Sequence, residues 1–151
     1  MKSIFVYGTL RPDISKSKGF CEKWKWCKEW NEIQTKDTKK IEKEGIIKNF
    51  KMYVGKEGYP FLIPSDCVHD CVHGVLQSFP NCSSVIFNSL LSYLDMVEGC
   101  PDEYFRSTLK VFDSNGVFLD NAFVYLPNQK IVDLSSSILV KSGNFLDFLV
   151  E

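Results

Sequence analysis

Hydrophobic and polar residues alternate in several short stretches of the chain, which is the pattern of β-strands with one buried face. The alternation is clearest in residues 104–112, where successive side chains are expected on opposite faces of a sheet. A turn at residues 113–116 joins this segment to residues 117–126, so the two are predicted to form a hairpin. Further strands are expected at residues 2–7, 45–54 and 71–79, with a short extended segment at residues 58–64.

Two other stretches carry hydrophobic residues at helical spacing. In residues 16–33, aromatic and apolar side chains recur every three or four positions, with Lys and Glu opposite them. The second helix begins after Ser83 or Ser84, either of which can cap it, and ends at Gly99. Its apolar stripe consists of Phe87, Leu90, Leu91, Leu94 and Val97.

The order of these elements predicts the fold class. Strands outnumber helices and most are joined by hairpins, so we expect an α+β fold. Its mixed, mostly antiparallel sheet would curl into a small barrel with flanking helices. Residues 35–44 are polar and rich in lysine. We therefore expect a single domain over residues 1–151, with a Lys-rich connector or insertion at about residues 34–45.

The composition fits one globular unit. Of the 151 residues, 44% are hydrophobic and 14% aromatic, which is enough to bury a core. The first residues lack the apolar stretch and cleavage site of a signal peptide. No apolar run reaches the roughly 18 residues of a membrane helix. We expect a soluble cytoplasmic protein that does not bind membranes.

The formal net charge of −1 hides an uneven distribution of charged residues. Residues 1–57 carry 14 Lys and Arg against 8 Asp and Glu, whereas residues 58–151 carry 4 against 11. Lysines and tryptophans alternate in residues 23–30, an arrangement that would suit nucleobase stacking beside phosphate contacts. However, interspersed acidic residues would repel a phosphate backbone, and helical spacing explains the tryptophans as a packing face. We predict a helix that packs on the core, and no nucleic-acid partner.

Six cysteines raise the questions of disulfides and of a metal site. Without an export signal, reduced thiols are expected. Cys67, His69, Cys71 and His73 stand at every second position of one segment. If this segment is a strand, neighbouring members of the set lie about 6.6 Å apart, too far for one zinc ion to bind three or four of them. We predict no metal site.

Residues Tyr7-Gly8-Thr9-Leu10 follow the first strand and form the first candidate functional segment. A glycine permits a sharp turn, and the successive peptide N–H groups of such a turn can point at one anion. A carboxylate or a developing oxyanion would fit there. The alternative interpretation is an ordinary strand end.

Glu98 is the second candidate, because it lies in the last turn of a helix. The negative end of the helix macrodipole and the like charge of Asp95, three residues earlier, both oppose its ionisation. If burial adds to these effects, the pKa of Glu98 rises toward neutrality. The carboxyl could then accept and return a proton near pH 7, whereas a solvated Glu98 would be ordinary surface.

Five motifs in a fixed order resemble the gamma-glutamylcyclotransferase-like family, which includes the AIG2-like proteins. A closing segment, residues 142–145, also looks like that family's final Ser-Gly-Asp-Trp. The five motifs are residues 5–12, residues 58–60, residues 72–76, residues 94–99 with Tyr104 and Arg106, and residues 122–125.

The resemblance implies a mixed α/β fold with a small barrel, and a cyclotransferase reaction. In this reaction the α-amino group of a γ-glutamyl amino acid or γ-glutamylamine attacks its own γ-carbonyl, releasing 5-oxoproline and the free amino acid or amine. Glu98 would act as general base and then as general acid. The backbone of Tyr7, Gly8, Thr9 and Leu10 would hold the substrate carboxylate or the oxyanion. No metal or organic cofactor is implied.

Three further residues are expected at the pocket. Tyr104 and Arg106 would place a hydroxyl and a guanidinium beside the substrate, or would pair with local carboxylates and orient the helix end. Tyr125 would form part of the pocket wall.

A non-catalytic AIG2-like protein that binds a small ligand or a partner is the alternative function, because fold does not fix function. The chain departs from the family pattern at residues 13–17, so its substrate is the least determined feature. We also state the hypothesis that the basic, aromatic segment covers the pocket or recognises an acidic group of the substrate. Either a monomer or a homodimer is compatible with the sequence.

Overall fold

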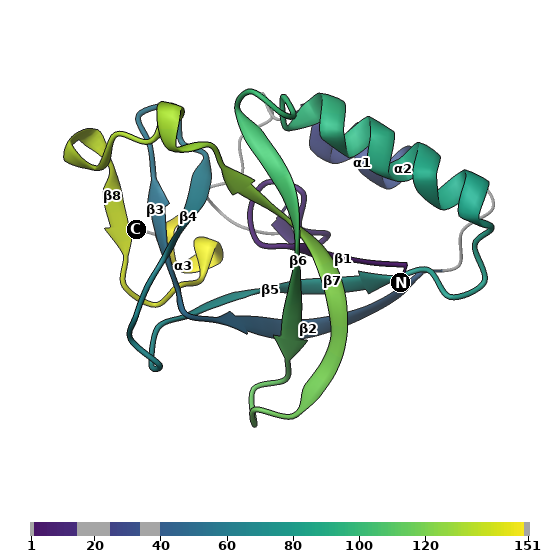
Figure 1. The fold of residues 1–151 in the computed structure, drawn as a ribbon, viewed down its shortest axis with the longest axis horizontal. Helices are drawn as coiled ribbons and strands as arrows, with labels where there is room; N and C mark the ends of the chain where they lie inside the picture. The colour runs from purple at the N-terminus through teal and green to yellow at the C-terminus, as the bar shows by residue number, and fades with distance from the viewer. Residues whose placement is uncertain (1, 15–24, 34–39, 150–151) are drawn as a thin grey trace.

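The computed structural model describes residues 2–14, 25–33 and 40–149. Within them, a closed barrel of five strands dominates the fold (Figure 1). Neighbouring barrel strands are antiparallel, except that β1 and β7 pair in parallel where Ile4 lies opposite Phe123 and closes the barrel. In order around the barrel the strands are β1 (Ser3–Val6), β5 (Cys71–Ser78), β2 (Ile41–Lys48), β6 (Tyr104–Phe112) and β7 (Phe118–Pro127).

A second, three-stranded sheet stands beside the barrel, on the left in Figure 1. Its order is β4 (Pro60–Pro64), β3 (Phe50–Val54) and β8 (Ile138–Val140). This arrangement confirms the expected α+β fold with a small, mostly antiparallel barrel. The remaining elements are α1 (Lys25–Ile33), α2 (Ser84–Val97), α3 (Phe145–Leu149) and two short 3-10 turns, η2 (Gln129–Ile131) and η3 (Leu134–Ser136).

The alternating side chains of β1 separate two hydrophobic clusters. Phe5 packs with the cluster that fills the barrel, whereas Ile4 and Val6 pack with the cluster beneath α2. Strand β7 divides in the same way, because Val124 belongs to the first cluster and Tyr125 to the second. Each strand therefore has two buried faces, one toward the barrel interior and one toward the helices.

The two longer helices lie together along one side of the barrel (Figure 1). Helix α2 begins where the sequence predicted, since the Ser83 hydroxyl accepts a hydrogen bond of 3.2 Å from the N–H of Ile86. In α1, Trp30 is fully buried and stacks on Tyr93 of α2, with ring centroids 6.2 Å apart. This is the packing role predicted for the aromatic segment; residues 16–24 of that predicted helix lie outside the described residues.

The single strand expected over residues 45–54 is two strands in different sheets. Asn49 separates them with a φ of 66°, a left-handed conformation that asparagine adopts more readily than most residues. The start was also misplaced, because residues 41–44 of the predicted Lys-rich connector belong to β2 and pair with β5. Residues 34–39 of that connector lie outside the described residues.

Four short elements near the C-terminus were not predicted: η2, η3, β8 and α3. They have between three and five residues, too few to produce a recognisable period.

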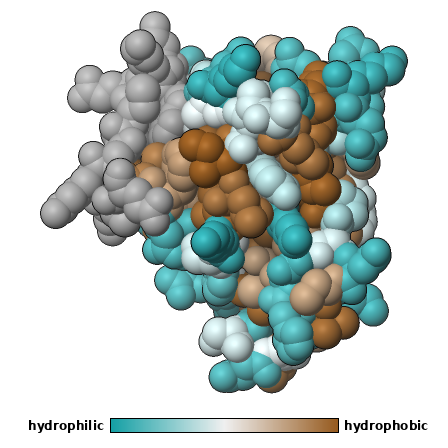
Figure 2. All heavy atoms as spheres, turned by 90° about the vertical axis from the view of Figure 1, so that its left-hand side faces the viewer, coloured by the Kyte–Doolittle hydropathy of each residue, from teal (hydrophilic) through white to brown (hydrophobic). Residues whose placement is uncertain are grey.

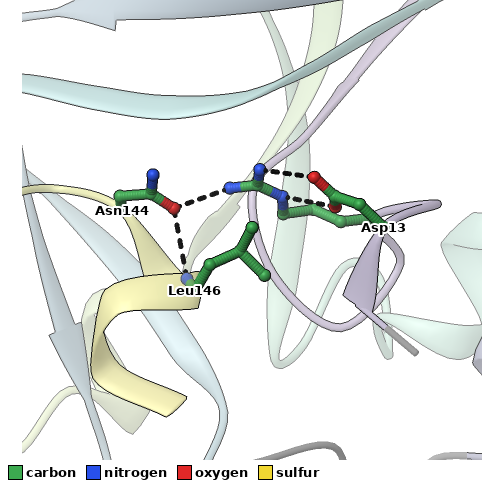
Figure 3. Close-up of polar contacts among 4 residues, drawn as sticks. Asp13, Asn144 and Leu146 are labelled. Atoms are coloured by element: carbon green, nitrogen blue, oxygen red, sulfur yellow. Dashed lines mark hydrogen bonds and ion pairs between the residues drawn. The ribbon is translucent and has the colours of Figure 1, made fainter. Parts of the chain in front are cut away.

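Figure 3 shows the hydrogen bonds that connect α3 to the loop after β1. Arg11 is buried, donates two hydrogen bonds of 3.0 and 2.9 Å to the carboxylate of Asp13, and donates a third of 2.9 Å to Asn144. The same Asn144 oxygen accepts the N–H of Leu146 at 3.1 Å and so caps α3.

Hydrophobic residues gather in the middle of the molecular face beside the three-stranded sheet, with hydrophilic ones above and below them (Figure 2). In the part of the chain that the structure describes, no helix is long and apolar enough to span a membrane. Several large hydrophobic residues of the C-terminal region are exposed, namely Ile131, Leu134, Ile138 and Leu139.

Asn144 provides a test of how the C-terminal helix is held. Replacing Asn144 with Ala removes one acceptor from the buried Arg11 and the cap of α3, so we expect a loss of about 1–2 kcal/mol in the free energy of unfolding. Asn144→Asp is the matched control, because it keeps the acceptor oxygen and adds a charge that attracts the guanidinium. Urea unfolding should rank Asn144→Asp at least as stable as the wild type. Equal stability of the Ala variant and the wild type would contradict a stabilising role for the Asn144 hydrogen bonds to Arg11 and Leu146.

Candidate active site

A cavity of about 660 Å³ opens between the loop after β1, the turn between β3 and β4, the end of α2 and the segment that carries η2 and η3. Its size is within the usual range for small-molecule sites. Seven of the eight residues proposed from the sequence line it: Tyr7, Gly8, Thr9, Leu10, Glu98, Tyr104 and Tyr125.

Glu98 reaches the cavity because it is the residue that caps the C-terminal end of α2. Glu98 is the last residue with helical backbone angles, and Gly99 follows in the left-handed region with a φ of 67°. The N–H of Gly99 bonds to the carbonyl of Met96 at 3.2 Å, and the N–H of Cys100 to that of Asp95 at 2.9 Å. This is a Schellman motif, for which glycine is the favoured residue. It confirms Gly99 as the predicted end of the helix.

Burial and a like charge together make Glu98 a weak acid. Burial is the larger effect and the Glu103 carboxylate the second, and they raise the pKa of Glu98 to about 7. The sequence predicted a like charge from Asp95 instead. In the structure Asp95 accepts a hydrogen bond of 2.6 Å from the Tyr125 hydroxyl and lies 3.7 Å from the Nε of Arg106. The neighbouring charge was therefore assigned to the wrong carboxylate.

Glu103 is brought back toward Glu98 by a tight turn. The N–H of Glu103 bonds to the carbonyl of Gly99 at 2.9 Å, and the carbonyl of Glu103 accepts from the N–H of Asn128 at 2.8 Å. Its carboxylate packs so closely on Gly99 that a Cβ there would lie 2.6 Å from Oε2. Gly99 thus ends the helix and also leaves room for the second carboxylate.

The loop of residues 7–10 forms the wall beside β7 and β4. The buried Tyr7 donates a hydrogen bond of 2.7 Å from its hydroxyl to the carbonyl of Tyr125. Burial, with the charge of Glu98 as a smaller effect, raises the pKa of the Tyr7 phenol well above its ordinary value, so it stays protonated. Gly8 lies against Pro60, whose Cγ would be 2.5 Å from a Cβ at this position. A glycine is therefore needed for the close approach of the two segments.

Tyr104 and Tyr125 are protonated phenols in the cavity wall. Burial raises the pKa of both, helped at Tyr104 by the charge of Glu98 and at Tyr125 by its hydrogen bond to Asp95. Arg106 is the one proposed residue that the structure does not bring to the cavity. Its guanidinium lies beside Asp95 and 5.1 Å from the centre of the Phe123 ring. This position favours the alternative considered for Arg106, which is to pair with a local carboxylate at the helix end.

Several residues in the cavity wall were missed from the sequence. Glu103 precedes Tyr104 directly, so the proximity of two acidic residues around Gly99 was a usable signal. The others come from turns that periodicity does not resolve, or from α1, where spacing could not show which tryptophan faces inward. They include Trp26, Lys56, Glu57, Tyr59, Pro60, Asp133, Ser136 and Ser137.

The histidine and cysteine run considered as a metal site is split between a loop and a strand. Cys71 and His73 lie on β5, with the Sγ of Cys71 3.9 Å from the Nε2 of His73, whereas Cys67 and His69 precede the strand. Over residues 2–14, 25–33 and 40–149, no group of three or more His, Cys, Asp or Glu side chains is arranged to hold a metal ion.

The model of the family "Gamma-glutamyl cyclotransferase, AIG2-like" matches residues 4–147, which is nearly the whole chain. The chain belongs to this family. The order of motifs in the sequence had indicated it. Comparison with curated proteins gives no match.

Three solved structures show the same fold. An AIG2-like protein from Mus musculus has 22% sequence identity and a TM-score of 0.59, over 89% of this chain and 80% of that one. A protein from Arabidopsis thaliana has 22% identity and a TM-score of 0.56, over 89% and 72% of the two chains. A structure described as a gamma-glutamyl cyclotransferase has 18% identity and a TM-score of 0.53, over 83% and 66%. At these identities the likeness establishes the fold and not the substrate.

The raised pKa of Glu98 predicts how the stability of this AIG2-like protein depends on pH. Between pH 4.5 and about 7, the folded protein keeps the Glu98 proton while the unfolded chain releases it, so stability falls as the pH rises. Glu98→Gln removes this contribution. The free energy of unfolding of the wild type, minus that of the variant, should fall by about 3 kcal/mol between about pH 4 and about pH 8.

Urea unfolding at several pH values measures this difference. Asp102→Asn is the control, because Asp102 is exposed in the same turn and does not line the cavity. A difference between wild type and Glu98→Gln that stays constant with pH would show that Glu98 titrates as an ordinary carboxyl.

Proposed function

We propose that the protein is a cyclotransferase that converts a γ-glutamyl amino acid or a γ-glutamylamine to 5-oxoproline and the free amino acid or amine. The observation that carries the proposal is the position of Glu98, a half-buried carboxyl with a pKa of about 7 in the same cavity as the loop of residues 7–10. Family membership supports the reaction class, since the matching family is that of AIG2-like gamma-glutamyl cyclotransferases.

The first step joins two atoms of the same substrate molecule. The α-amino nitrogen attacks the γ-carbonyl carbon, a C–N bond forms, and the carbonyl oxygen becomes an oxyanion. The ionised Glu98 accepts the proton that the nitrogen loses. Because the ring closure is intramolecular, the main contribution of the cavity walls is to hold the glutamyl chain folded.

The second step breaks the original amide bond. Glu98, now protonated, gives its proton to the leaving nitrogen as the C–N bond breaks, the carbonyl re-forms, and the free amine departs. A carboxyl with a pKa near neutrality suits both steps, because it is present in both forms at pH 7. Proton uptake and release balance, and Glu98 ends the cycle as it began.

The loop of residues 7–10 and the tyrosines would bind the charged parts of the substrate. Backbone N–H groups of the loop would hold the α-carboxylate or the oxyanion. Tyr104, with a hydroxyl that stays protonated, would be a neutral donor next to Glu98. The reaction as written uses no metal or organic cofactor. A cytoplasmic location remains a prediction.

The direct test is release of 5-oxoproline from a panel of γ-glutamyl compounds, including γ-glutamyl amino acids, glutathione and the γ-glutamyl-lysine isopeptide. We expect Glu98→Gln to lower kcat/KM for the best substrate by about 100-fold or more, because general acid–base catalysis typically contributes that much. Asp102→Asn should retain full activity. Undiminished release by Glu98→Gln would overturn the mechanism, and no release by the wild type from any compound would favour the non-catalytic binding protein.

Replacing Glu103 should shift the pH dependence of kcat/KM. With Glu98 as the base, kcat/KM should rise with pH through an apparent pKa near 7. Glu103→Gln removes the like charge that opposes ionisation of Glu98, so the rising limb should move to lower pH, while burial keeps it above the ordinary value for a carboxyl. Steady-state kinetics over pH 5–9 measures the limb, with Asp102→Asn as control. A limb that stays in place would show that Glu103 does not act on the titrating group.

A further inference from the structure

Trp26, from helix α1, forms part of the cavity wall. Its indole N–H donates a hydrogen bond of 2.8 Å to the hydroxyl of Thr9, in the loop proposed to hold the substrate. Its ring contacts the edge of Tyr59, with centroids 5.5 Å apart and planes at 66°. Thr9 and Tyr59 line the same cavity. Trp26 therefore connects the loop after β1 with the turn between β3 and β4.

Helix α1 holds Trp26 in place from one turn away. Trp30 is fully buried, donates a hydrogen bond of 3.2 Å to the side chain of Gln77, and stacks on Tyr93. Tyr93 also donates a hydrogen bond of 2.9 Å to Glu29 of α1. A side chain on an anchored helix presents a defined surface to the cavity.

The residues that line the cavity indicate which half of the substrate Trp26 would face. If the glutamyl half of the substrate lies between Glu98 and the loop of residues 7–10, the amine half extends toward the remaining walls. These include the edge made by Trp26 and Tyr59, together with Phe61 and Ile131. Aromatic rings at such an edge give up little conformational entropy and bind apolar and aromatic groups well.

We propose that Trp26 is a specificity-determining residue, which with Tyr59 selects γ-glutamyl compounds whose amine half carries a bulky apolar or aromatic group. This inference rests on the proposed function. The hydrogen bond to Thr9 fixes the loop of residues 7–10 relative to this wall. The ring sets the preference for the amine half, and the N–H positions the loop for every substrate.

The test compares γ-glutamylglycine, γ-glutamylalanine, γ-glutamylleucine and γ-glutamylphenylalanine. The wild type should show rising kcat/KM along this series. Trp26→Ala loses both the ring and the N–H. It should lower kcat/KM for the glycine compound through the lost hydrogen bond alone, and for the phenylalanine compound roughly tenfold further, mainly through KM. Lys28→Ala is the control on the same helix, because Lys28 is exposed and does not line the cavity. It should leave the ranking unchanged.

A second pair of variants separates the ring from its hydrogen bond. Trp26→Phe keeps an aromatic ring and loses the N–H, and Thr9→Val removes the acceptor with little change in shape. Each should lower kcat/KM about equally for all four compounds, and the double variant should be no worse than either single one, because the two changes break one interaction. Fully additive losses would overturn the positioning role. A ranking unchanged in Trp26→Ala would overturn the specificity role.

A binding measurement distinguishes failure of this inference from failure of the proposed function. The indole N–H resonances of Trp26 and Trp30 are followed by ¹⁵N NMR while the phenylalanine compound is added to the Glu98→Gln variant. We expect the Trp26 resonance to shift and the Trp30 resonance to stay. If the wild type turns over no compound and the Trp26 resonance still shifts, the proposed reaction is wrong, but the proposed contact between Trp26 and the amine half is supported. An unmoved Trp26 resonance overturns that contact whether or not turnover is seen.

Discussion

The left-handed turn at Gly99 is the constraint on which the site depends. It ends α2 so that Glu98 is the last helical residue, and the chain then returns to place Glu103 against the same glycine. Any side chain at position 99 would meet the Glu103 carboxylate and would also strain the backbone. The raised pKa of Glu98 follows from this geometry, because the turn buries one carboxyl and sets a second beside it. The proposed general base, with a pKa near neutrality, is thus a product of how one helix terminates.

Tyr125 connects the two walls between which that base lies. Its carbonyl accepts the Tyr7 hydroxyl from the loop after β1, and its own hydroxyl donates to Asp95 of α2. Arg106 lies beside the same Asp95 and compensates its charge. A single residue of β7 therefore fixes the distance between the proposed anion-binding loop and the end of the helix. Such rigid support is what a proton transfer needs, since small displacements of the reacting groups reduce the rate greatly.

The sequence predicted the features that have a long period or a distinctive end. The barrel strands other than β2, a serine cap at Ser83 or Ser84 and the Gly99 terminus of α2 were each recognisable from a few residues. The break at Asn49 was not, because the chain leaves one sheet for another without a proline or glycine and the hydrophobic residues continue across it. The short elements of the C-terminal region, including α3 capped by Asn144, depend on tertiary contacts such as that with Arg11.

The assignment of charges around Glu98 shows a second limit of sequence reasoning. Spacing of three residues along a helix brings Asp95 near Glu98 only if the helix continues and both side chains face the same space. Here the helix ends, and Asp95 turns to Tyr125 and Arg106, so Glu103 supplies the neighbouring charge from beyond the turn. The position of an acidic residue after a glycine terminus is decided by the turn and not by helical periodicity.

The cavity combines parts of two kinds. Glu98, the loop of residues 7–10 and Tyr104 fall within the motifs on which the sequence resemblance rests, whereas Trp26 comes from the basic, aromatic segment between them. Glu98, the loop and Tyr104 lie where the proposed chemistry would occur, and Trp26 lines the part of the cavity proposed to hold the amine half. Because Trp26 is anchored through Trp30 and not through Glu98, its surface can change without disturbing the helix end that sets the pKa. Under the proposed function, a change of the Trp26 ring that keeps its N–H would alter the choice of amine half and leave the loop of residues 7–10 and the end of α2 in place.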